Sequence, residues 1–339
     1  MVKGVDDSCE ELCDDQPNSD GGLPSISRNV PACVHLARLW QEAKPQLNGG
    51  TGPGRAVWAV APPLDSRSGR SYQLTSMSPL RLSLLTVCSV AVVAYASCDM
   101  IHEAMGHGVA CAIIPGVRAL SISTVATQTS SESRAVAAAG SIANAIAGVL
   151  CFALYRRRKG FDATRFFLWL LATINLMNGT GYLFFSGLLD YGDWAVVIAG
   201  LRPHWMWRAV IGAVGIAAYW GVVRFSAAQM AVVVRDGLVN RRDVRGLVFS
   251  AYVAGGLLLL AGAALNPISP QLILLSGASS GFAAMAGLLF VPRLVERDTQ
   301  DSSSPAPALG FSAGWLALGI VTAAVFVCLL GPGISLSHG

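Results

Sequence analysis

Apolar segments of twenty or more residues follow one another from Pro79 to the end of this sequence. A helix needs about 20 apolar residues, at about 1.5 Å each, to cross a hydrocarbon core about 30 Å thick. Only 13% of the residues are charged, whereas soluble domains carry about 25%. The sequence therefore predicts an all-α fold, a polytopic membrane helix bundle of about seven transmembrane helices. The expected spans are 80–112, 135–155, 165–189, 205–227, 246–266, 269–291 and 310–331.

Residues 1–79 differ in composition from the rest of the chain. The stretch "DDSCEELCDDQPNSDGGLPS" is acidic and rich in turn formers, and no charged segment followed by an apolar run marks a secretory signal. We expect a disordered leader here. A start of translation at Met77 is the alternative. The predicted organisation is thus a leader at 1–79, a membrane core at 80–200 and additional transmembrane helices at 201–339.

Two connecting segments have features of their own. "VRALSISTVATQTSSES", between the first two spans, partly alternates β-branched and polar residues, which favours a short β-hairpin. The segment from Asp190 to Leu201 is too short to cross a bilayer, so we expect a loop or a re-entrant turn.

The basic residues are distributed unevenly among the loops. "RRRKGFDATR", "RDGLVNRRDVR" and "RLVER" occupy alternate connections, and the other connections are poorer in Lys and Arg. The positive-inside rule then predicts a multi-pass integral membrane protein with a cytoplasmic N-terminus. The compact loops fit a bacterial-type inner membrane. A net charge of +4 in such clusters calls for the lipid bilayer as a partner and not for a nucleic acid.

The residues 101–108, "IHEAMGHG", place three ionisable side chains in the first span. Such residues are costly inside a membrane and therefore point to a function. His102 and His107 are candidate metal ligands, and Glu103 is a candidate general base, because zinc hydrolysis uses imidazole ligands and a carboxylate. A purely structural polar cluster at a helix end is the alternative interpretation.

The spacing of the two histidines is unusual for a shared metal. Residues i and i+5 lie about 140° apart on a regular helix, so His102 and His107 would point to different sides. A π-bulge would return them to one face, and such bulges occur mostly at functional sites. Gly106 is where the backbone deforms most easily. Alternatively, Glu103 and His107, four residues apart, form the pair that shares a face.

Two later motifs carry further candidates. In "AAGSIAN", Gly140 and Asn144 lie on one face of the second span, and Asn144 should point into the protein because lipid would penalise it. In "INLMNGTGYLFFSGLLDYGDW", Asp190 and Asp193 follow the third span, and either could supply a carboxylate ligand. Counted from the basic residues that flank each span, all three motifs fall toward the outer side of the bilayer.

"HEAMGHG", "AGSIAN" and "NLMNG…DYGDW", in this order, resemble the site-2 protease family of polytopic membrane zinc metalloproteases. That family has H-E-x-x-H in one span, A-G-P-x-x-N in the next and a later Asp as third zinc ligand. The resemblance covers about residues 80–200. This chain departs from the pattern by one extra residue before His107, by Ser141 in place of proline and by lacking a compact N-P-D-G segment.

The resemblance implies a Zn²⁺ cofactor and a membrane protein or peptide as the substrate. His102, His107 and either Asp193 or Asp190 would hold the zinc, Glu103 would activate water, and Asn144 would hydrogen-bond the substrate backbone or the developing oxyanion. The cleaved peptide bond would lie in or near a membrane helix. A non-catalytic integral membrane protein that binds metal or acts as a scaffold, such as a pseudoenzyme or a transporter-like protein, is the alternative.

Overall fold

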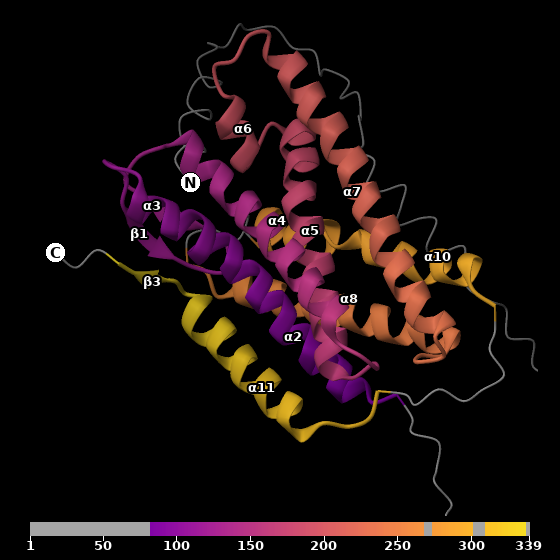
Figure 1. The fold of residues 1–339 in the computed structure, drawn as a ribbon. Helices are drawn as coiled ribbons and strands as arrows, with labels where there is room; N and C mark the ends of the chain where they lie inside the picture. The colour runs from indigo at the N-terminus through magenta and orange to yellow at the C-terminus, as the bar shows by residue number, and fades with distance from the viewer. Residues whose placement is uncertain (1–81, 268–272, 301–308, 337–339) are drawn as a thin grey trace, which may run out of the picture. The chain divides into compact units, whose positions relative to one another are not determined.

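The computed structural model describes residues 82–267, 273–300 and 309–336 (Figure 1). The predicted leader, residues 1–79, lies outside these ranges, as does part of the connection predicted between the fifth and sixth spans. The described chain is mostly helical, with one small three-stranded sheet. The predicted helical membrane bundle is therefore confirmed.

Within the described ranges, six helical segments are long and apolar enough to cross a membrane. Three are single helices: α4 (Arg134–Arg157), α7 (His204–Arg235) and α8 (Arg241–Ala264). The segment Leu84–Ile113 joins α2 (Leu84–Met100), η1 (Ile101–Gly108) and α3 (Val109–Ile113). The segment Gly277–Asp298 contains most of η2 (Ile273–Ala283), followed by η3 (Ala286–Phe290) and α10 (Val291–Asp298). The segment Ala313–Leu330 joins α11 (Ala313–Ala324) to η4 (Val325–Leu330).

The third predicted span is the helix α5 (Ala163–Leu189), which is long enough to cross but is not among these six. It packs against α2, α4 and α7 (Figure 1), and its Asn175 and Asn178 are buried among them. The polar side chains that lower its apolarity thus face protein and not lipid. The predicted connection after it contains the six-residue helix α6 (Asp193–Ile198).

Local sequence explains where several helices begin. The side chains of Ser83, Ser133, Asp162 and Ser312 accept hydrogen bonds from the first turns of α2, α4, α5 and α11. Oxygen-bearing side chains are preferred at this position because they satisfy amides that have no partner within the helix. Each of the four lies just before an apolar stretch, so it also marks where the chain enters the bundle.

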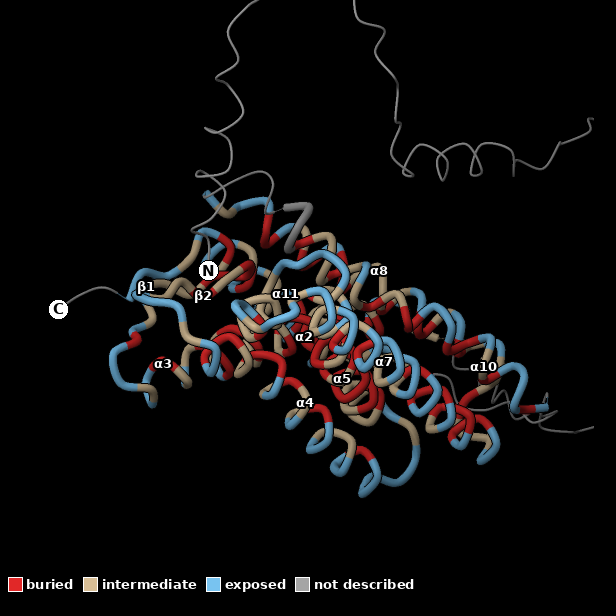
Figure 2. The backbone as a smooth tube through the Cα atoms, turned by 90° about the horizontal axis from the view of Figure 1, so that it is seen from above, coloured by how far each residue is buried: buried red, intermediate tan, exposed pale blue. Residues whose placement is uncertain are grey.

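The outer surface of the bundle is largely apolar. Buried residues follow the inner faces of the helices, and exposed residues follow the outer faces (Figure 2). Ile320 and Val321 of α11 are exposed by 62% and 59%, and Val214 and Trp220 of α7 are also exposed. A surface of this kind suits contact with lipid chains.

A three-stranded antiparallel sheet, in the order β2-β1-β3, packs beside η1. The strands β1 (Ala119–Ile122) and β2 (Thr127–Thr129) form the predicted hairpin, which is confirmed. The third strand, β3 (Ile334–Ser335), was not predicted, because two residues near a chain end carry no usable alternation. It pairs with β1 and so ties the end of η4 to the hairpin.

Candidate metal centre

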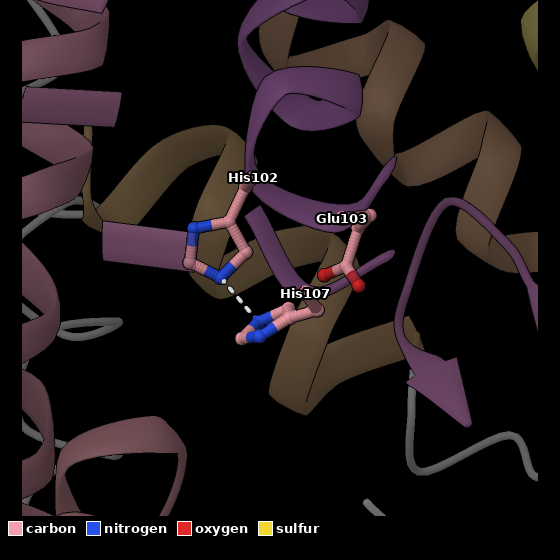
Figure 3. A group of neighbouring side chains, drawn as sticks. All are labelled: His102, Glu103 and His107. Carbon is pink, nitrogen blue, oxygen red and sulfur yellow. Dashed lines mark hydrogen bonds between the residues drawn. The ribbon is translucent and has the colours of Figure 1, made fainter. Parts of the chain in front are cut away.

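The residues 101–108 form a π-helical stretch, η1, between two regular helices. It brings the rings of His102 and His107 to one side, with their Nε2 atoms 3.2 Å apart (Figure 3). The predicted π-bulge is confirmed. The extra residue in H-E-x-x-x-H is therefore absorbed by the backbone, and the two imidazoles face each other despite their spacing of five.

A chain of hydrogen bonds fixes the orientation of His102. Asn175 donates its side-chain amide to the Leu171 carbonyl at 2.8 Å, so its own side-chain oxygen is the acceptor. Asn144 donates to that oxygen at 2.8 Å, and also to the Cys98 carbonyl at 3.1 Å. The Asn144 oxygen must then accept from His102 Nδ1, at 2.7 Å. This leaves His102 Nε2 as the nitrogen that faces the centre.

His107 is held in the same way by the main chain. Its Nδ1 lies 2.7 Å from the carbonyl oxygen of Val136, which can only accept a hydrogen bond. His107 Nε2 is therefore turned toward His102 Nε2. In their neutral forms both nitrogens present lone pairs to each other, and this contact is repulsive unless a cation or a proton lies between them.

Asp193, at the start of α6, completes the group. Its Oδ2 lies 3.0 Å from His102 Nε2 and 3.4 Å from His107 Nε2, and its side chain is 20% exposed. Burial acts to raise the pKa of Asp193, but hydrogen bonds with the two histidines and their charges lower it below its usual value. This lowering requires protons on the histidines; with neutral imidazoles, Asp193 Oδ2 and the two Nε2 atoms are all acceptors.

Asp190 lies elsewhere. Both of its carboxylate oxygens are 3.0 Å from His204 Nε2, and Oδ2 is 3.5 Å from Arg208 Nη1. Of the two aspartates that the sequence left as alternatives, the structure therefore brings Asp193 to the histidines and pairs Asp190 with the first turns of α7.

Glu103 lies beside the histidines, and the donor atoms of His102, Glu103 and His107 are all within 4.8 Å of one another (Figure 3). The three residues could hold a metal ion. The set of His102, His107 and Asp193 is more closely spaced, with 3.0–3.4 Å between its atoms. Glu103 is buried, and its Oε2 has no hydrogen-bond partner, so this oxygen is free to accept a proton or a water molecule.

Two glycines let the helices approach closely enough to form this centre. A Cβ atom on Gly106 of η1 would lie 2.5 Å from the Cα atom of Gly140 in α4. A Cβ atom on Gly140 would lie 2.7 Å from His102 Nε2 and 2.7 Å from His107 Nε2. Any side chain at position 140 would occupy the space that both imidazoles use.

Asn144 has a different position from the one that the resemblance implies. It is fully buried behind His102, and its oxygen and amide are taken up by His102, Cys98 and Asn175. Both of its amide hydrogens have acceptors within the bundle, and its oxygen faces His102. Asn144 orients a histidine instead.

Three further contributors were not identified as site residues from the sequence. The role of the Val136 carbonyl could not be predicted from the sequence, because every residue has a main-chain carbonyl. Tyr182 stacks on His102, with ring centroids 4.5 Å apart. The sequence did contain an indication of this role, because the spacing of Asn175, Asn178 and Tyr182 places all three on one face of α5. Thr127 of β2 donates its hydroxyl to the Glu103 carbonyl at 3.0 Å.

The centre therefore joins residues from η1, α4, α5 and α6, with β2 packed behind Glu103. Its acceptor atoms converge on one point, and the buried carboxylate of Glu103 lies beside them. Inferences about function rest on this geometry, because comparison with models of known families, with curated proteins and with solved structures finds no match.

Proposed function

We propose that this chain is a membrane-embedded zinc-dependent peptidase. The observation that carries the proposal is the convergence of three acceptor atoms, two imidazole nitrogens and an ionised carboxylate, beside the free carboxylate oxygen of Glu103. Such a group is stable only around a cation or with added protons. With protonated histidines, His102 would donate from Nε2 to Asp193 and the group would be an ion pair without a metal, so metal content separates the two states.

The donor set and its spacing fit zinc. Zinc binds nitrogen and carboxylate ligands tetrahedrally at about 2.0–2.1 Å, which places neighbouring ligand atoms about 3.3 Å apart. The three separations here are 3.0, 3.2 and 3.4 Å. Three protein ligands, His102, His107 and Asp193, leave a fourth position open, as in catalytic sites. Zinc held there would supply a Lewis acid that makes a water molecule ionise near neutral pH.

Glu103 is suited to the role of general base. It would accept the proton of the attacking water on Oε2 and pass it to the leaving amine. The Asn144 side-chain oxygen and the Val136 carbonyl oxygen accept from Nδ1 of the two histidines, so that Nε2 would face the metal, and Tyr182 covers one face of His102. These three residues act by positioning and have no proton to transfer in this scheme.

The substrate that best fits is a membrane protein or peptide, cleaved in or near a transmembrane helix. Support comes from the location of His102, Glu103 and His107 on an apolar segment long enough to cross a bilayer. The order of the motifs, which resembles that of site-2 proteases, points the same way. The distribution of basic residues supports a cytoplasmic N-terminus, and the compact loops fit a bacterial-type inner membrane.

One observation favours a second candidate, a transporter-like or scaffold protein that binds metal without hydrolysis. Asp99 lies four residues before Glu103 on the same helical segment, and its buried Oδ2 has no hydrogen-bond partner. A second carboxyl inside a span is typical of cation or proton pathways.

Metal content tests the site itself. We expect about one zinc per chain in the detergent-purified protein, and its loss in His102→Ala, His107→Ala and Asp193→Ala, because two protein ligands hold zinc poorly. Asp162→Ala is the matched control, since Asp162 pairs with an arginine at the opposite end of α5. A folded wild-type protein that takes up no zinc, or that keeps it in all three variants, would refute the proposal.

Replacement of Asn144 by alanine tests the orienting role. With no acceptor for its Nδ1 hydrogen, His102 is expected to lose its fixed orientation, and zinc affinity should fall by about 10–100-fold. A competition titration with a chelating dye measures this. Asn178→Ala is the control, because Asn178 is also a buried amide of the bundle but donates its hydrogen bond to Cys98 and not to a histidine. Equal affinities in the two variants would contradict the assigned role.

A further inference from the structure

Asp193 differs from the two histidines in how it is held. The histidines lie on η1, within a segment that is packed in the bundle, whereas Asp193 begins a six-residue helix between α5 and α7. No side chain caps α6. A helix of this length has little stability of its own. The position of the Asp193 carboxylate therefore depends on the packing of α6 against α4, α5 and α7 and on the contacts at the ends of its segment.

The first of these contacts is made by Asp190. This residue ends α5 in the left-handed conformation, with φ of 55°, which is uncommon for residues other than glycine. Its carboxylate accepts a hydrogen bond from His204 and lies 3.5 Å from Arg208 Nη1, both in the first turns of α7. Arg208 also donates to the last carbonyls of α5, those of Gly187 and Leu188, at 3.2 and 2.8 Å.

The second contact holds the other end of the segment. The Arg134 guanidinium, at the start of α4, donates to the carbonyl of Ala199, directly after α6. Between the two contacts, Gly192 adopts φ of 85°, so the chain reverses just before Asp193. Only Tyr191 and Gly192 separate Asp190 from Asp193. A shift of Asp190 must therefore be passed on to the carboxylate that faces the histidines.

From this arrangement we infer that the Asp190–His204–Arg208 cluster is a positioning device for Asp193. It closes the base of the segment 190–203 and holds Asp193 Oδ2 at 3.0 and 3.4 Å from the two histidines. Metal sites tolerate displacements of only about 0.5 Å. The effect on metal affinity rests on the proposed function, whereas the effect on the order of α6 does not.

The experiment measures amide hydrogen exchange in residues 191–199 of the full chain, first without added metal. Asp190→Asn removes the charge but keeps a residue that tolerates the left-handed conformation, and His204→Ala removes the donor. We expect each to speed exchange in this segment by about fivefold, the scale expected for a partly exposed charge pair. Asp162→Asn, which alters an ion pair at the other end of α5, should leave the segment unchanged.

The double variant distinguishes a specific pair from general loosening. If Asp190 acts through His204, Asp190→Asn combined with His204→Ala should exchange no faster than either single variant. Additive effects, or exchange equal to that of Asp162→Asn, would overturn the inference. The dissociation constant for zinc should rise by about fivefold in the same variants, because the segment must then be ordered on binding. If the wild-type protein binds no zinc, the proposed function is refuted, but the hydrogen-exchange result still decides whether Asp190 and His204 order α6.

Discussion

Replacing Glu103 by glutamine is expected to abolish peptide hydrolysis while leaving the zinc content unchanged. Glutamine keeps the shape of the side chain but cannot accept a proton, and loss of a positioned general base costs about 10²–10⁴-fold in rate. Glu103 lies outside the more closely spaced set formed by His102, His107 and Asp193, so metal binding should persist. Cleavage of an apolar helical peptide carrying a fluorophore and a quencher, reconstituted in vesicles, gives the rate. Elemental analysis of the same sample gives the metal.

The control for this experiment is Glu132→Gln, an exposed glutamate in the connection before α4. It makes the same chemical change away from the site and should keep the wild-type rate. A wild-type protein that binds zinc but cleaves no faster than Glu103→Gln would contradict the peptidase proposal. That outcome would favour the transporter-like or scaffold candidate, for which the partnerless oxygens of Asp99 and Glu103 are the supporting observation.

Replacing Gly140 by alanine is expected to remove zinc binding with only one added methyl group. Its Cβ would lie 2.7 Å from the Nε2 atoms of His102 and His107, nearer than a Cβ atom approaches its neighbours. Either the imidazoles turn aside or α4 moves away from η1. In both cases the ligand atoms leave their positions, and we expect zinc affinity to fall by at least about 100-fold. The free energy of unfolding should also fall, by about 1–3 kcal/mol, because the site is overpacked.

Gly148→Ala separates the loss of the site from crowding between helices. Gly148 lies on the same helix, and a Cβ atom there would meet the Leu176 side chain at 2.6 Å, away from the histidines. This variant should lose stability in thermal unfolding yet bind zinc with wild-type affinity. If Gly140→Ala bound zinc as tightly as Gly148→Ala, the close approach of α4 to the imidazoles would not matter for the metal.

Several features were predictable because they depend on local physics. The cost of exposing backbone groups to lipid makes long apolar segments helical, so the spans could be placed from the residues alone. The alternation of β-branched and polar residues placed the hairpin between the first two spans. The spacing of His102 and His107 required a deformed helix if both were to serve one site. Gly106 was the expected point of deformation, and η1 has this form. The close approach to Gly140 explains why position 106 also has to be small.

Other features depended on contacts between distant segments. Asn144 was predicted to point into the protein and to hydrogen-bond the substrate backbone or the developing oxyanion, and the sequence alone offered no partner for it within the protein. The structure engages it with Asn175 and Cys98 on two other helices and with His102. The strand β3 is defined only by its pairing with β1, which the tertiary structure brings beside it. Neither partner is near in sequence, so no local pattern could indicate the pairing.

The sequence by itself determined that this chain forms apolar helices suited to a membrane, and that one helix must distort to bring two histidines and a glutamate together. Only the tertiary structure decided which aspartate faces those histidines. Asp190 and Asp193 both lie within four residues of the end of α5, and the same carboxylate chemistry serves either choice. His204 and Arg208 engage Asp190, and the reversal at Gly192 turns Asp193 inward. The choice depends on competing partners from another helix, which act only after the helices have packed.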